Sequence, residues 1–156
     1  MPVRDGYVDK VRFPRVGRVP SKANYRHGRK GTNKAWAKIK EFEQDMQKHA
    51  LVFGGKMRED CVVEIHVVLI NQRVDADNAN KAILDSLQGV YFKDDSKKYL
   101  RSIHIEHLPD DPELSPSLVI EVRWYERARR VYPKGTLLEA KVVPGGYRVL
   151  GKVGDD

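Results

Sequence analysis

Residues 74 to 85 combine carboxylates, amides and a lysine at spacings suited to metal-assisted chemistry. The segment reads Val-Asp-Ala-Asp-Asn-Ala-Asn-Lys-Ala-Ile-Leu-Asp. On a helical wheel, Lys81 falls about 40° and Asp85 about 80° from Asp77, whereas Ile83 falls on the opposite side. Asp77 and Lys81 are one turn apart, about 6 Å along the axis, so both side chains can act on one ligand.

Asp75 lies two residues before Asp77, where the chain enters this helix. If Asp75 is extended, both carboxylates can converge on one cation, with Asp94 and Asp95 as a second supply a short loop away. Two or three carboxylates with retained waters suit Mg²⁺ or Mn²⁺. The alternative is that Asp75 and Asp77 only cap the helix, with Asp77 and Lys81 as an exposed ion pair.

Charge is distributed unevenly along the 156 residues, which suffice for one domain or one domain with an appendage. Residues 1–40 contain twelve Lys and Arg against two Asp, whereas residues 41–156 carry a net charge of −3. A basic arm on a mildly acidic body predicts a polyanionic partner such as nucleic acid. The alternative is a solvated basic tail that only aids solubility.

Other chemical classes find little support in the sequence. Apolar runs are far shorter than a membrane span, and the first residues lack a signal-peptide stretch, so we expect no membrane association. A single cysteine, Cys61, excludes an internal disulfide and a cysteine-based zinc site, and its apolar neighbours indicate a core position. His104 and His107 are three residues apart in an apparent strand and face opposite ways, so they do not predict a zinc pair.

Hydrophobic periodicity predicts a mixed α/β fold, in which a small mixed β-sheet carries two packed helices. After an extended basic segment over 1–31, we expect a helix over 34–50, a strand over 61–70, a helix over 77–88, strands over 100–107 and 117–125, and a hairpin within 127–156. Gly89 is expected to end the second helix. We therefore expect one domain over 1–126, including the basic arm, followed by a C-terminal extension over 127–156.

The acidic segment resembles the RusA-type Holliday-junction resolvases of bacteria and their prophages. The matching pattern is Asp75-x-Asp77-Asn78-x-x-Lys81-x-x-x-Asp85 followed by Asp94-Asp95, and the similarity extends from about Pro20 to Glu126. The resemblance implies a cytoplasmic homodimer that cuts four-way DNA junctions by paired nicks and requires Mg²⁺, for which Mn²⁺ can substitute.

The resemblance also assigns roles to individual residues. Asp75, Asp77 and Asp95 would be the metal-binding catalytic aspartates, with Asp94 as a further metal ligand and Lys81 as the essential lysine. Asn78 and Asp85 would support them. The basic arm would follow the DNA backbone through contacts of Arg15, Arg18, Arg26, Arg29 and Lys30.

Some alternatives remain open from the sequence. Tyr91 and Phe92 could wedge into a junction or fill the core, and we favour the core. The chain could be a catalytically silent nucleic-acid-binding relative, or a small metal-binding or interaction domain with another partner.

Overall fold

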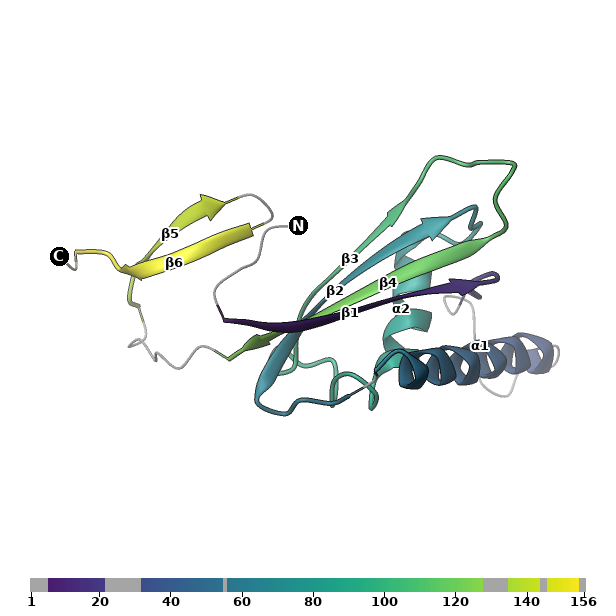
Figure 1. Cartoon of the computed structure of the whole chain (residues 1–156), viewed down its shortest axis with the longest axis horizontal. Coiled ribbons are helices and arrows are strands. Elements are labelled where there is room, and N and C mark those ends of the chain that lie inside the picture. Colours follow the sequence, from purple (N-terminus) through teal and green to yellow (C-terminus); the bar gives the residue numbers. More distant parts are fainter. Residues whose placement is uncertain (1–5, 22–31, 55, 128–134, 144–145, 155–156) are drawn as a thin grey trace.

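A computed structural model describes residues 6–21, 32–54, 56–127, 135–143 and 146–154. Its elements are β1 (Tyr7–Val16), α1 (Thr32–Val52), β2 (Cys61–Ile70), α2 (Ala76–Leu87), β3 (Leu100–His107), β4 (Ser117–Glu126), β5 (Leu138–Val143) and β6 (Gly146–Lys152) (Figure 1). The expected helices and strands are present, and the expected mixed α/β fold is confirmed.

The main sheet has four strands in the order β1-β4-β2-β3. Strand β4 is antiparallel to both β1 and β2, whereas β2 and β3 are parallel and are joined through α2. Because a crossover helix runs back along the sheet, α2 begins near the end of β2 and ends near the start of β3 (Figure 1). This topology decides where each candidate side chain lies.

Both helices pack on one face of this sheet. Alternate residues of β2 are buried on that face, namely Val63, Ile65, Val67 and Leu69. They share one hydrophobic cluster with Phe42 and Met46 of α1 and with Ala79, Ala82, Ile83 and Leu87 of α2. The buried stripe of α2 is therefore opposite the polar face that the helical wheel predicts.

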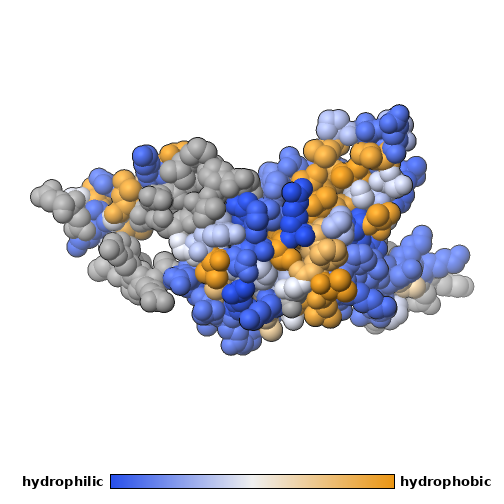
Figure 2. Space-filling model, viewed as in Figure 1, coloured by the Kyte–Doolittle hydropathy of each residue, from blue (hydrophilic) through white to orange (hydrophobic). Residues whose placement is uncertain are grey.

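The other face of the sheet has no described helix on it. Its β2 side chains Glu64, His66, Val68 and Ile70 are half-buried. Seen from the side away from α2, this face shows hydrophobic side chains beside hydrophilic ones (Figure 2). A mixed, partly open sheet face is thus available for polar chemistry.

Strands β5 and β6 form the expected C-terminal hairpin. Among the described residues, the hairpin packs against no other helix or strand, and Figure 1 shows it beside the main sheet. The boundary at residue 127 stays a prediction. None of the described helices is both long enough and apolar enough to cross a membrane.

Candidate active site

Gln72 ties three segments together just beyond the end of β2. Its side chain is only 8% exposed. Its Oε1 accepts a hydrogen bond from the Val19 amide at 2.9 Å, and its Nε2 donates to the carbonyls of Gly17 at 2.8 Å and Ser117 at 3.0 Å. The start of α2, four residues later, is thereby anchored to the segment after β1 and to β4.

The backbone of Asp75 caps the start of α2, whereas its carboxylate makes no capping hydrogen bond. It is the N-cap residue in an extended conformation, with φ −66° and ψ 151°, as convergence with Asp77 requires. Its carbonyl accepts the first helical hydrogen bond, from the Ala79 amide at 2.9 Å. Its side chain makes no capping hydrogen bond. Capping therefore does not account for this carboxylate.

The polar face of α2 points to solvent as expected. Asp77, Lys81 and Asp85 are exposed, and Asn78 is half-buried. Among the described residues, Asp77 and Lys81 form no ion pair with each other, although they are one helical turn apart. The start of α2 thus presents two carboxylates and an ammonium group that the described fold does not use.

Asp94 and Asp95 lie at the other end of the β2–β3 pair. The Asp94 carboxylate accepts a hydrogen bond from the Ser96 amide at 2.8 Å, and the Ser96 carbonyl accepts one from the Tyr99 amide at 3.0 Å. The Tyr99 carbonyl in turn accepts one from the amide of Val63, near the start of β2, at 2.8 Å. Hydrogen bonds from Ser96 lower the pKa of Asp94.

The full set of predicted metal ligands therefore does not meet within one chain. Twelve residues of α2, about 18 Å along the axis, separate Asp75 and Asp77 from the Asp94–Asp95 loop. In agreement, the described residues hold a single group of three His, Cys, Asp or Glu side chains whose ligand atoms all lie within 4.8 Å of one another, and it contains none of these aspartates.

A basic groove of about 710 Å³ lies between the end of β1 and α1, next to the segment that Gln72 anchors. Arg18, Lys38 and Lys48 line it. Arg15 also lines it, but its guanidinium pairs with Asp45 at 2.6 Å and lies 4.6 Å from the centre of the Phe42 ring. Arg18 is exposed, whereas the side chain of Arg15 is only 10% exposed. The other three predicted contacts, Arg26, Arg29 and Lys30, lie outside the described residues.

Core positions account for the remaining candidates. Tyr91 and Phe92 are fully buried, which confirms the favoured core reading over a junction wedge. Cys61 is also buried, and burial raises the pKa of its thiol.

Two residues near the site escaped sequence reasoning. Gln72 carries no signal beyond following a strand. Asn80 has a buried Oδ1 without a hydrogen-bond partner among the described residues, one position before Lys81. An amide in a helix that already has several polar residues gives no sign of such burial.

Comparison with protein families gives a match over most of the chain. The family described as Endodeoxyribonuclease RusA matches residues 17–123. The matched range includes the start of α2, the Asp94–Asp95 loop and every residue that lines the basic groove except Arg15, and it ends before the C-terminal hairpin. No curated protein matches the chain.

Proposed function

Because the chain belongs to the RusA endodeoxyribonuclease family, we propose that it is a Mg²⁺-dependent, structure-selective endonuclease that resolves four-way DNA junctions by paired nicks. One observation carries the proposal. Asp75, Asp77 and Lys81 are exposed at the start of α2, and no capping bond or ion pair among the described residues occupies them. Two carboxylates two residues apart repel each other when no cation lies between them, so this arrangement favours binding of a divalent metal ion.

The donor set fits a hard divalent cation. Asp75 and Asp77 offer carboxylate oxygens on the exposed side of α2, the ligand type that Mg²⁺ prefers while it retains several waters. A Mg²⁺ ion held by Asp75, Asp77 and Asp95 would supply Lewis-acid stabilisation for water attack on a phosphodiester. Lys81 stabilises negative charge developing on the phosphate. Asn78 and Asp85 support this arrangement by orienting Lys81.

DNA would approach along the basic groove. Arg18, Lys38 and Lys48 provide cations beside α1, at the end of the sheet where α2 begins. Arg26, Arg29 and Lys30 extend the positive charge through the segment between β1 and α1. Such contacts position the sugar–phosphate backbone without reading sequence, which suits recognition of junction shape.

A homodimer would complete the metal site. Asp95 lies about one helix length from Asp75 in the same chain, so a second copy is needed to bring the three carboxylates together. A two-fold axis would produce two equivalent sites, as paired nicks on opposed strands require.

The decisive test is cleavage of a synthetic four-way junction in Mg²⁺. The wild-type chain is expected to make paired nicks in the junction and to leave a linear duplex of the same sequence intact. Asp75→Asn and Lys81→Ala are each expected to lower the cleavage rate at least about 100-fold, because each removes a group that acts on the reacting phosphate. Junction binding should persist in both variants.

Matched changes in the hairpin control for the loss of charge alone. Glu139→Gln and Lys141→Ala replace exposed residues of β5 and should leave the cleavage rate within about twofold of wild type. If the wild-type chain binds the junction in a salt-dependent manner but does not cleave it in Mg²⁺ or Mn²⁺, the proposal is wrong and the chain is a silent DNA-binding module. If it shows no salt-dependent DNA affinity, both readings fail.

A further inference from the structure

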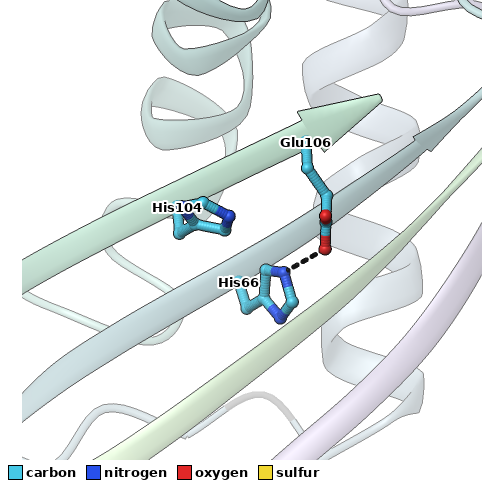
Figure 3. Close-up of side chains that lie close together, drawn as sticks. All are labelled: His66, His104 and Glu106. Atoms are coloured by element: carbon cyan, nitrogen blue, oxygen red, sulfur yellow. Dashed lines mark hydrogen bonds and ion pairs between the residues drawn. The ribbon is translucent and has the colours of Figure 1, made fainter. Parts of the chain in front are cut away.

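Three metal-ligating side chains meet on the face of the sheet opposite α2. His66 belongs to β2, and His104 and Glu106 belong to β3 (Figure 3). In the parallel register, His66 pairs with His104 and Val68 pairs with Glu106. Because alternate residues of a strand share a face, all three side chains project to the same side.

Their geometry is close to that of a metal site. The Nε2 of His66 lies 2.8 Å from the Oε1 of Glu106, and the His66 and His104 rings have centres 5.1 Å apart. All three ligand atoms lie within 4.8 Å of one another. Among the described residues, no other three His, Cys, Asp or Glu side chains meet this condition.

The ligand set suits zinc. Two imidazoles and one carboxylate are a common zinc donor set that leaves a fourth position for water. Zinc–nitrogen distances near 2.1 Å place tetrahedral ligand atoms about 3.4 Å apart. His104 and Glu106 are exposed on the edge strand and can make this adjustment, whereas His66 is held half-buried in β2.

An ion pair between His66 and Glu106 explains less of this arrangement than a metal site does. Exposed pairs of this kind contribute only about 0–1 kcal/mol to stability. The pair also gives no role to His104, which makes no hydrogen bond or ion pair among the described residues and whose one ring contact there is with His66. The exposed side chains of His104 and Glu106 leave the group open to a metal ion from solvent.

We propose that His66, His104 and Glu106 form a Zn²⁺ site that links the edge strand β3 to β2. The site lies across the sheet from α2 and is therefore separate from the carboxylates that we assign to Mg²⁺. Zinc bound there stabilises the β2–β3 pair and, with it, the loop that precedes β3.

Zinc binding to the tag-free chain, measured by calorimetry and by thermal unfolding, tests this site. The wild-type chain is expected to bind one Zn²⁺ per chain at this site and to unfold at a higher temperature when Zn²⁺ is present, because the ion binds only the folded state. His104→Ala and Glu106→Gln should each weaken the Zn²⁺ affinity more than about tenfold and abolish the thermal shift. Even the loss of a residue that only hydrogen-bonds to a metal ligand lowers metal affinity about 10–100-fold. Cobalt in place of zinc should give the strong visible absorption of a four-coordinate site in the wild type but not in His104→Ala or Glu106→Gln.

Two controls separate this site from other histidines and from the carboxylates of α2. His107→Ala changes a histidine on the same strand that lies outside the group, and it should bind Zn²⁺ like wild type. The double variant Asp75→Asn, Asp77→Asn should also retain the binding. The proposal would be overturned if the wild-type chain did not bind Zn²⁺. It would also be overturned if His104→Ala and Glu106→Gln bound Zn²⁺ as tightly as the wild type. Both of those variants lie on an exposed edge, and unfolding curves without metal would confirm that they fold.

Discussion

Arg15 and Arg18 show how neighbouring cations acquire different roles. The guanidinium of Arg15 is shielded by Phe42 and paired with Asp45, so its charge is already compensated within the fold. Arg18, three residues later, contributes its carbonyl to Arg15 at 3.4 Å and leaves its own side chain exposed to the groove. The sequence places both in one basic segment, and only tertiary contacts distinguish them.

We expect substitutions of these two arginines to separate stability from DNA binding. Arg18→Ala should reduce the slope of log K against log salt by about 1 and change the free energy of unfolding by less than about 0.5 kcal/mol. Arg15→Ala should lower the free energy of unfolding by about 1–2 kcal/mol, because this pair is intermediate between an exposed and a buried one, and should leave the salt slope unchanged. Fluorescence anisotropy on a labelled junction in the Asp75→Asn background measures the slope, and urea unfolding measures the stability. Exchanged behaviour of the two variants would contradict the assignment.

At the scale of elements, Tyr91 joins the loop after α2 to the end of α1. Its hydroxyl donates a hydrogen bond to the carbonyl of Ala50 at 3.1 Å, in the last turn of α1, where carbonyls lack helical partners. The ring is fully buried, and burial raises the pKa of Tyr91 to about 12. This contact holds the two helices in a fixed relation beneath the sheet.

Tyr91→Phe should therefore lower the stability at pH 8 and have little effect near pH 11. At pH 8, loss of the hydrogen bond is expected to lower the free energy of unfolding by about 1 kcal/mol. The unfolded tyrosine ionises near pH 10, whereas the folded one keeps its proton to about 12, so wild-type stability is complete below pH 10 and falls as the pH rises toward 12. The phenylalanine variant lacks this loss, and its deficit should disappear near pH 11. Urea unfolding of both proteins at pH 8 and pH 11 measures the difference, and a constant deficit would show that the hydroxyl ionises freely.

Local patterns suffice for the elements but not for their arrangement. The alternation of β2 and the polar face of α2 follow from residue periodicity, and the structure confirms both. The strand order β1-β4-β2-β3 depends on pairings between distant segments that no local pattern encodes. For the same reason, the meeting of His66 with Glu106, 40 residues later, depends on the β2–β3 register. The position of Asp95 also does not follow from the sequence alone. The short loop after the helix suggests that Asp95 lies near Asp75 and Asp77, but α2 carries the chain away from them.

At the scale of the whole molecule, the predicted aspartate ligands lie in two groups that must come together to bind one metal ion. Asp75 and Asp77 begin α2, and Asp95 follows its end, so a rigid crossover helix keeps them apart in each chain. Completing the site within one chain would require the loop before β3 to leave its place, although the amide of Val63 holds Tyr99 at the start of β2. In the homodimer that we propose, a second chain would meet the requirement without changing either fold.

Mixing two inactive variants tests this arrangement. In a mixed dimer of Asp75→Asn and Asp95→Asn chains, one composite site carries both substitutions while the other has all its carboxylates. Random mixing of equal amounts should produce mixed dimers as about half of the population. We therefore expect the mixture to nick the junction on a single strand, although neither variant cleaves alone. A mixture of Asp75→Asn with Asp77→Asn is the matched control, since each composite site then lacks one carboxylate and nicking should remain absent. If each site instead lies within a single chain, both sites of every mixed dimer are damaged, and the first mixture will be as inactive as the control.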